Sequence, residues 1–330
     1  MSSEPTSTVI ISVNPKAGRK SPMIRAEELQ GRLREKGFEV RLLTDLAEVA
    51  ETSNLLHAEK RLRALVGVGG DGTAATLVNL TEPGTPITLL SAGTANLLAK
   101  HFRLGRSPQQ IAEVVENGSV LTLDAGRAVT GKDNGNDNER KERLFLVMVS
   151  CGFDADIVNG VHSQREARYE SGHRKGAHIS YFSYVKPIMK SLFGYRFEKM
   201  KVEKFDGTDW GDVEDRVRWA FFFNMNRYGW GLPLAPYAKE NDGFLDHVLF
   251  RGGTTLHGFF YLALAQCFSM HRFFSWAHMG QATKYRITSN APLPFQLDGD
   301  PGGTLPLEIE VIPNRLTFLV PESTARRFAR

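Results

Sequence analysis

The sequence predicts an α/β protein, with a parallel sheet in the first 120 residues and an antiparallel β domain after them. Two observations predict this division. Up to about residue 120, apolar β-branched runs alternate with stretches whose apolar residues recur at helical spacing, which is typical of right-handed βαβ units. Beyond it, many strand-like runs follow one another with few helices between them, which favours an antiparallel sandwich or barrel.

The first half begins with a strand expected at residues 8–13, an apolar run rich in β-branched residues. A helix at 22–36 follows, because Ile24, Leu29 and Leu33 recur at helical spacing before Gly37. The remaining expected elements are strands at 38–43, 64–68 and 87–90 and helices at 46–59, 74–80, 95–102 and 108–116. In such a sheet, ligands bind at the carboxyl ends of the strands.

The second half begins with strands expected at 120–130 and 143–150, which flank a polar hairpin tip at 131–139. The further strand-like runs are 195–205, 217–225, 246–250, 284–288, 295–297, 307–312 and 316–320. Helical spacing recurs at 156–169, 178–192 and 256–274. Strands therefore outnumber helices in this half.

The composition is that of an ordinary soluble chain of 330 residues, or about two domains at roughly 100–200 residues each. Its two cysteines, Cys151 and Cys267, are too few and too far apart for a disulfide framework or a zinc site, which suits a reducing compartment. The N-terminus has no secretory signal pattern, and the longest apolar stretch, 256–270, is shorter than a membrane span. We therefore expect a cytoplasmic protein.

The net charge of +4 is too small to indicate nucleic acid binding, but it is unevenly distributed. Residues 161–204, here called the basic segment, hold ten Lys or Arg and four Glu, a net +6 that leaves −2 for the rest of the chain. Aromatic residues are interleaved with these charges. The basic segment is either a solvated face or a contact for an anionic surface.

The strongest candidate site is the turn at 66–73, where a strand runs into three glycines, Asp71 and Thr73 before a helix. Glycines let a phosphate approach the main chain, and the N-terminus of the following helix favours an anion. Asp71 would repel phosphate unless it meets a cation, which points to Mg²⁺-nucleotide chemistry. The alternative is a tight turn in which Asp71 caps a helix.

Two similar turns follow neighbouring strands, at 14–18 after the first and at 91–96 after the fourth. Because these turns belong to one sheet edge, a common pocket is expected. None of them matches the P-loop pattern or the dinucleotide-binding pattern. A P-loop NTPase and a hydride-transfer enzyme are therefore both disfavoured.

Two acidic turns occur in the second half. The turn at 236–246 is dense in oxygen ligands, and Asp242 with nearby carbonyls could bind a hard cation such as Mg²⁺; a plain Asp-Gly hairpin turn is the alternative. The turn at 296–301 places two acids beside a glycine, where a carboxylate could act as a general base; a structural turn is again the alternative.

Together these motifs resemble those of the diacylglycerol kinase catalytic-domain family, soluble lipid kinases that include sphingosine and ceramide kinases and bacterial diacylglycerol kinases. The resemblance runs over nearly the whole chain. The matching segments, in order, are Asn14-Pro-x-x-Gly18, Gly69-Gly-Asp-Gly-Thr73, Gly93-Thr-x-Asn96, Asp124-x-Gly126, Gly152-Phe-Asp-Ala155, Pro236-x-Ala-x-x-x-Asp-Gly-x-Leu-Asp246 and Asp298-Gly-Asp300.

The resemblance implies an NAD kinase-like nucleotide-binding domain at 1–125, to which 316–330 return, and a β-sandwich lipid-substrate domain at 126–315. ATP and lipid are expected to meet in the cleft between them. The implied catalytic residues are Asp298, as general base, and Asp71, which would organise Mg²⁺ at the phosphates. The carbonyls of Lys239 and Phe244 with Asp242 would form a structural Mg²⁺ site. The implied nucleotide contacts are Asn14, Pro15, Lys16, Ala17, Gly18, Thr44, Gly70, Asp71, Gly72, Thr73, Ala74, Ala75, Thr76 and Thr94.

The chain departs from the family pattern at three places. Ala75-Thr76 stand where the family often has Asn-Glu, so any contact from that acid is missing. Asp300 replaces a glutamate, and Leu97 replaces an acid that often follows the third turn. Because this Asn-Glu pair is missing, a catalytically silent, lipid-binding protein is an alternative to an active kinase.

The function expected is ATP-dependent phosphorylation of a lipid hydroxyl, such as that of diacylglycerol or a sphingoid base. An NAD kinase-like enzyme and the silent protein are the alternatives. Expected partners are the lipid, a transiently contacted anionic membrane surface and, as an alternative to a monomer, a second copy in a homodimer; nucleic acid is not expected. The apolar stretches 179–185 and 256–264 are either walls for the lipid or ordinary helical core. We therefore expect a cytoplasmic enzyme that is peripheral to the membrane.

Overall fold

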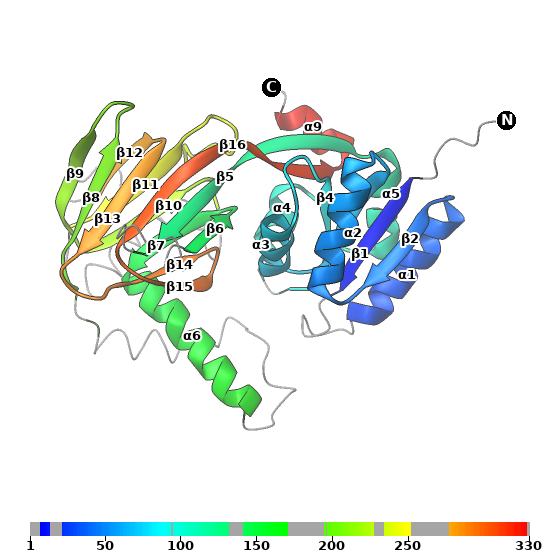
Figure 1. The fold of residues 1–330 in the computed structure, drawn as a ribbon, viewed down its shortest axis with the longest axis horizontal. Coiled ribbons are helices and arrows are strands. Elements are labelled where there is room, and N and C mark those ends of the chain that lie inside the picture. The colour runs from blue at the N-terminus through cyan, green and yellow to red at the C-terminus, as the bar shows by residue number, and fades with distance from the viewer. Residues whose placement is uncertain are drawn as a thin grey trace. The chain divides into compact units, whose positions relative to one another are not determined.

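The computed structural model describes residues 7–13, 22–93, 95–131, 141–170, 195, 197–227, 234–251 and 277–328 (Figure 1). The chain divides into two compact units. Unit one is Met1–Leu123 with Asn314–Arg330, and unit two is Asp124–Pro313. Two strands, β5 (Ser119–Thr130) and β16 (Leu307–Val320), contribute residues to both units.

Unit one contains the predicted parallel sheet. Its strands lie in the order β2 (Glu39–Leu43), β1 (Thr8–Val13), β3 (Leu62–Gly69), β4 (Ile87–Ser91) and β16. Each neighbouring pair is parallel. All six residues of β1 are buried, as expected of a strand with neighbours on both sides and helices over both faces.

Helices cover both faces of this sheet. α1 (Pro22–Glu35) packs on β1 and β2 and against α5 (Pro108–Asn117), whereas α2 (Leu46–Ala58) packs on β1 and β3 and against α3 (Asp71–Leu80). The crossovers from β1 to β2 and from β2 to β3 run in opposite directions along the sheet. Right-handed connections therefore place α1 and α2 on opposite faces. Two short helices, α4 (Leu97–His101) and α9 (Glu322–Phe328), also belong to unit one.

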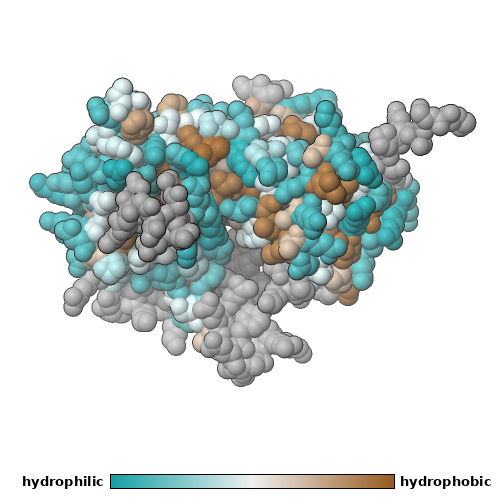
Figure 2. All heavy atoms as spheres, in the orientation of Figure 1, coloured by the Kyte–Doolittle hydropathy of each residue, from teal (hydrophilic) through white to brown (hydrophobic). Residues whose placement is uncertain are grey.

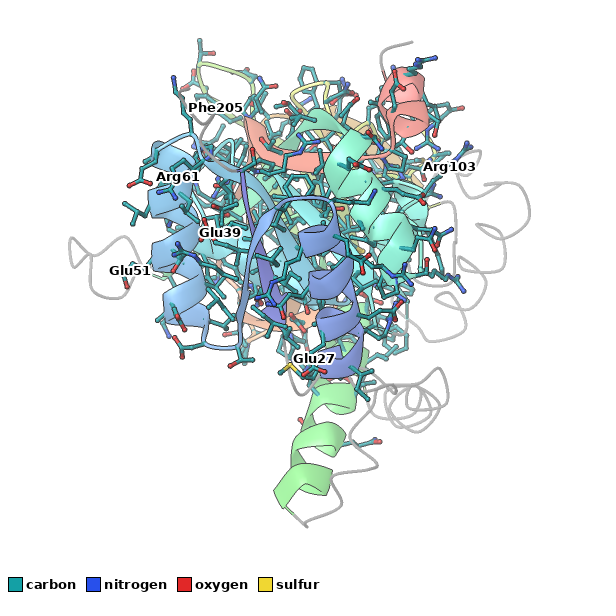
Figure 3. All side chains as sticks on the ribbon, turned by 90° about the vertical axis from the view of Figure 1, so that its right-hand side faces the viewer. Glu27, Glu39, Glu51, Arg61, Arg103 and Phe205 are labelled. Carbon is teal, nitrogen blue, oxygen red and sulfur yellow. The ribbon has the colours of Figure 1, made fainter. Side chains whose placement is uncertain are left out.

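Charged side chains lie on the outside of unit one. Figure 3 labels Glu27 on α1 and Glu51 on α2, both of which are exposed. It also labels Glu39 and Arg61, whose carboxylate and guanidinium are 3.8 Å apart at the amino edge of the sheet. The opposite, carboxyl edge carries the glycine-rich turns.

Unit two contains two antiparallel sheets. One is β12 (Ala277–Ala282), β11 (Leu245–Phe250), β10 (Trp219–Phe223), β7 (Met148–Gly152), β14 (Pro294–Leu297) and β15 (Asp300–Thr304), in that order. The other runs from β16 through β13 (Lys284–Ser289) and β8 (Met200–Phe205) to β9 (Trp210–Val217), with β5 and β6 (Lys141–Phe145) paired beside β16. A single core cluster draws side chains from both sheets, among them Phe145, Phe222 and Tyr285. The sandwich is thereby confirmed, and with it the α/β class of the whole chain.

The exposed side of the second sheet is charged. Lys201 on β8 pairs with Glu203 at 2.9 Å and with Asp212 of β9 at 2.8 Å. Figure 2 shows a mainly hydrophilic surface on its left, where Figure 1 places β8 and β9. This side of the sheet therefore faces water.

Some expected elements differ from the observed ones. The single strand expected at 143–150 is two strands, β6 and β7, interrupted at residues 146–147. The strands expected at 307–312 and 316–320 are one continuous strand, β16. α6 (Phe153–Glu170) begins three residues before the helix expected from 156. The helices expected at 178–192 and 256–274 and most of the polar tip at 131–139 lie outside the described residues.

Candidate functional site

The first candidate site lies at the carboxyl ends of β3 and β4. Gly70 caps α3 with an extended backbone, and Thr73 and Ala74 donate their N–H groups to its carbonyl at 3.0 and 3.2 Å. A Cβ atom added to Gly93 would lie 2.7 Å from the Cα of Gly70, so the turns after β3 and β4 approach closely enough to exclude a side chain. The structure thus brings Gly70 and Gly93 together.

Asp71 links these two turns. Its Oδ2 accepts the N–H of Leu97 and its Oδ1 the N–H of Leu98, each at 3.0 Å, so the carboxylate caps the start of α4. Burial raises the pKa of Asp71, although these two N–H groups and Lys100 oppose the rise. Asp71 therefore caps a helix, as the alternative interpretation expects, and the helix that it caps is α4. A role in organising Mg²⁺ stays a prediction.

The other expected nucleotide contacts lie in α3, after β2, or outside the described residues. Ala74 and Ala75 are buried in α3, whereas Gly72 is exposed. Thr76 donates its hydroxyl to the Gly72 carbonyl at 2.9 Å, within the same helix. Thr44 is exposed directly after β2, at the same sheet edge. Lying outside the described residues are Asn14, Pro15, Lys16, Ala17, Gly18 and Thr94.

The second candidate site is the turn between β14 and β15, which carries Asp298. Asp298 and Gly299 both adopt left-handed backbone conformations, with φ of 52° and 88°. The Asp298 carboxylate accepts three backbone N–H groups between β6 and β7: Leu146 at 2.7 Å, Val147 at 2.8 Å and Met148 at 3.0 Å. These bonds explain why the strand expected at 143–150 is interrupted.

Burial dominates the electrostatics of Asp298. It raises the pKa of this carboxyl to about 6, against the opposing effect of the three N–H groups and of Arg143. A carboxyl with this pKa is ionised at neutral pH and remains a stronger base than an exposed aspartate. The turn therefore presents a carboxylate suited to accepting a proton.

Three further side chains, which sequence reasoning did not assign to the site, hold this turn. Arg143 of β6 donates to Asp300 Oδ2 at 3.0 Å. The buried Gln296 accepts the Gly299 N–H at 2.7 Å, and His162 of α6 lies 3.1 Å from the Gly299 carbonyl. Gln296 belongs to the motif itself, but Arg143 and His162 come from distant parts of the chain with no local pattern to mark them.

The third candidate site is the turn before β11. Asp242 is exposed and accepts the Phe244 N–H at 3.1 Å, while Asp124 accepts the Gly243 N–H at 2.8 Å. Burial and the neighbouring Asp124 raise the pKa of Asp242; burial and Asp242 raise the pKa of Asp246 to about 6. These like charges suit a cation.

Side chains alone do not provide a complete set of Mg²⁺ ligands at this turn. The buried Oδ2 of Asp246 has no hydrogen-bond partner among the residues that the structure describes. Among all the residues that the structure describes, no group of three or more His, Cys, Asp or Glu side chains is placed to hold a metal ion. A cation here would thus depend on carbonyl oxygens as well, as the expected set of Lys239, Asp242 and Phe244 does.

Most of the basic segment and both apolar stretches, 179–185 and 256–264, lie outside the described residues. Within the described ranges, no helix is both long enough and apolar enough to cross a membrane.

Comparison with known proteins places this geometry in a family. Residues 8–128 match the model of the diacylglycerol kinase catalytic domain, and residues 148–320 match that of the YegS C-terminal NAD kinase beta sandwich-like domain. A diacylglycerol kinase of Mycobacterium tuberculosis is 27% identical over 320 residues, which cover 93% of each chain.

Solved structures show the same fold. A diacylglycerol kinase from Bacillus anthracis has a TM-score of 0.65 at 17% identity and covers 98% of this chain and 99% of its own. An NAD kinase from Archaeoglobus fulgidus in complex with ATP has a TM-score of 0.51 at 15% identity, with coverage of 98% and 97%. With both domain models matched in order, the chain belongs to the diacylglycerol kinase catalytic-domain family of lipid kinases.

Proposed function

We propose that this chain transfers the γ-phosphoryl group of ATP to the hydroxyl of a lipid such as diacylglycerol or a sphingoid base. The observation that carries the proposal is the Asp298 carboxylate, held in a left-handed turn with a pKa of about 6. A carboxylate offers about four lone-pair sites, and three are taken by backbone N–H groups. One site is left to accept a proton from an alcohol.

In the proposed reaction, the lipid hydroxyl oxygen attacks the γ-phosphorus while its proton passes to Asp298. The bond between the γ-phosphorus and the bridging oxygen of ADP breaks, and ADP leaves with that electron pair. An unassisted alcohol is a weak nucleophile, so the transfer depends on positioning, charge neutralisation and the base. This chemistry supports Asp298 as the catalytic residue of unit two.

The turns of unit one support the nucleotide half of the proposal. Gly70, the N-cap of α3, has no side chain, and the N-terminus of α3 favours an anion such as a phosphate. Asp71 fixes the second turn by capping α4. Thr44 lies at the same sheet edge, and Asn14 to Gly18 and Thr94, which lie outside the described residues, complete the proposed nucleotide contacts.

Two roles are proposed for Mg²⁺. At the nucleotide it supplies charge neutralisation of the phosphates when bound. At the turn before β11, the carbonyls of Lys239 and Phe244 with the Asp242 carboxylate would hold it. There it would offset the negative charge that raises the pKa values of Asp242 and Asp246.

The test is transfer of labelled phosphate from ATP by the purified full chain. The acceptors are diacylglycerol, sphingosine, ceramide and an isoprenoid alcohol in phosphatidylcholine vesicles, with NAD offered in parallel. We expect a labelled lipid phosphate, identified by mass spectrometry. Asp298→Asn should reduce its formation by about 10²–10⁴-fold, the usual contribution of a general base.

Three outcomes oppose the proposal. Labelled NADP without lipid product would make the chain an NAD kinase-like enzyme. Lipid binding without turnover would make it a silent binding protein. Near-normal turnover by Asp298→Asn would remove the base from the mechanism and leave the family activity in place.

The proposal extends to the membrane. A soluble enzyme must visit a bilayer to reach its lipid, and the net +6 of the basic segment suits anionic headgroups. We expect sedimentation with vesicles to rise with their phosphatidylglycerol content and to fall with added salt. Binding that ignores both variables would contradict the membrane contact.

A further inference from the structure

The backbone of Gly299, directly after the proposed base Asp298, is held by side chains on both sides of its Cα. Gln296 Oε1 accepts its N–H at 2.7 Å, and His162 Nε2 lies 3.1 Å from its carbonyl oxygen. A carbonyl oxygen can only accept a hydrogen bond, so His162 must carry its proton on Nε2 and donate it. The two peptide groups that meet at the Gly299 Cα are thereby fixed in orientation.

This fixation matters because Asp298 is strained. Its φ of 52° is in the left-handed region, which a residue with a side chain rarely adopts. Such a conformation persists only where the surroundings over-determine it. The bond from His162 is part of that surrounding, one residue away from the carboxylate that it helps to aim.

Both side chains that hold the Gly299 backbone involve α6: His162 belongs to it, and Gln296 is hydrogen-bonded to it. Near the start of this helix, Asp154 accepts a hydrogen bond from Ser150 and another, at 3.3 Å, from Gln296 Nε2. About two turns further along, His162 reaches the Gly299 carbonyl. Figure 1 shows α6 starting beside β14 and β15 and extending away from them. The first half of the helix therefore lies beside the turn that carries the proposed base.

Asp300 adds a second contact to His162. Its Oδ2 accepts from Arg143, and its Oδ1 lies 3.6 Å from His162 Nε2, too far for a hydrogen bond but close enough for ion pairing with a protonated ring. The imidazole is mostly buried, with 18% of its side chain exposed. It thus contacts the turn at Gly299 and at Asp300.

We propose that His162 is a positioning residue for the phosphoryl transfer, which holds the Gly299 carbonyl so that the Asp298 carboxylate keeps its aim. This inference rests on the proposed function. His162 takes no part in proton transfer and acts only through the Gly299 carbonyl. Its removal should slow the chemical step and leave nucleotide binding by unit one unchanged.

The test compares His162→Leu, which cannot donate, with His162→Gln, whose amide N–H can. Ser163→Leu adds the same apolar side chain at the neighbouring exposed position of α6 and serves as the control. With ATP and the best acceptor among the four lipids, we expect His162→Leu to lower kcat about tenfold, the effect of one lost hydrogen bond. KM for ATP should stay within about twofold, and His162→Gln should recover kcat to within about threefold of wild type.

Amide hydrogen exchange gives a readout that does not need activity. The N–H groups of Leu146, Val147 and Met148 donate to Asp298, so a loosened turn should expose them. We expect their exchange to be faster in His162→Leu than in wild type and close to wild type in His162→Gln and Ser163→Leu. If His162→Leu does not fold, His162→Met replaces it as the variant without a donor.

The outcomes separate this inference from the proposed function. An unchanged kcat in His162→Leu, or an equal loss in His162→Gln, overturns the positioning role while the kinase stands. If the wild-type chain phosphorylates none of the acceptors, the proposed function fails. Exchange then decides about His162 alone, and unaltered exchange in His162→Leu overturns its hold on the turn.

Discussion

At the scale of the residue, Asp298 combines structural and chemical demands. Its carboxylate accepts the N–H groups between β6 and β7, and burial raises its pKa to about 6. A base with this pKa is protonated in acid and loses its function there. We expect log kcat to rise with pH through about 6 and to level off near 7, as measured by initial rates across buffers. An acidic limb near pH 4 would assign the proton acceptor to another carboxylate.

Asp71 shows a different use of a carboxylate, as a cap for a helix that begins 26 residues later. Asp71→Ala should lower the free energy of unfolding by about 0.5–2 kcal/mol without nucleotide or Mg²⁺, because two N–H groups lose their acceptor. Urea denaturation measures this loss, and calorimetry should show weaker ATP binding.

The matched control for Asp71 is Asp45, whose side chain caps α2 by accepting the Glu48 N–H at 3.0 Å. Asp45→Ala should lose similar stability and keep its affinity for ATP. If Asp71→Ala is as stable as wild type and binds only Mg²⁺-ATP less well, the capping role is wrong and the metal role holds.

At the scale of the element, α3 is held at both ends. Its N-terminus carries the glycine-rich turn, and at its C-terminus Arg315 donates to the carbonyls of Val78 and Thr81 at 2.9 and 2.5 Å. Charged hydrogen bonds of this kind are worth about 1.5–3 kcal/mol. We expect Arg315→Ala to lose that much stability in urea denaturation. Arg326→Ala, which removes an exposed pair with Glu322, should lose under about 0.5 kcal/mol; equal losses would refute the special role of Arg315.

The elements also show what local pattern can and cannot predict. Short, mainly apolar runs such as β1 and β4 were predictable because a strand buried on both faces is mainly apolar throughout. β15 was not, because its sequence is Asp-Pro-Gly-Gly-Thr; it pairs with β14, and the ring of Phe295 lies where a side chain of Gly302 would be. The interruption between β6 and β7 depends on Asp298, about 150 residues away.

The same reasoning applies to the candidate site. The glycine-rich turns could be predicted to converge because the carboxyl ends of parallel strands share one edge. The partners of the Asp298 turn could not, since Arg143, His162 and Gln296 meet only through the packing of unit two. Sequence pattern thus singled out Asp298 as a candidate, and the tertiary structure shows which residues hold its turn.

At the scale of the whole molecule, the end of the chain completes the first unit. Leu316, Phe318, Leu319 and Val320 of β16 are at most 1% exposed, and Phe318 pairs with Ile87 of β4. Burial of such side chains contributes about 1.5–3 kcal/mol each, which together approaches the whole stability of a domain. A chain that ends at Pro313 should therefore leave unit one unfolded, as judged by circular dichroism and proteolysis. Removal of residues 329–330 alone is the control; a truncated unit one that resists protease would contradict the prediction.

Global stability should also depend on pH through Asp298. Its folded pKa of about 6 is above the ordinary 3.8, so the folded state holds the proton more tightly than the unfolded chain. The resulting stabilisation is complete below about pH 4 and is lost as pH rises through about 6. We expect wild type to lose roughly 2–3 kcal/mol more than Asp298→Asn over this interval in urea denaturation. Parallel curves for the two proteins would show that Asp298 has an ordinary pKa.

The shared strand β16 has a consequence for the order of events during synthesis. A ribosome releases the chain from its beginning, and domains usually fold in that order. Here the first unit lacks one of its strands until residues 314–320 emerge, whereas Asp124–Pro313 is already available to fold. Unit one, whose synthesis begins first, is therefore completed after unit two.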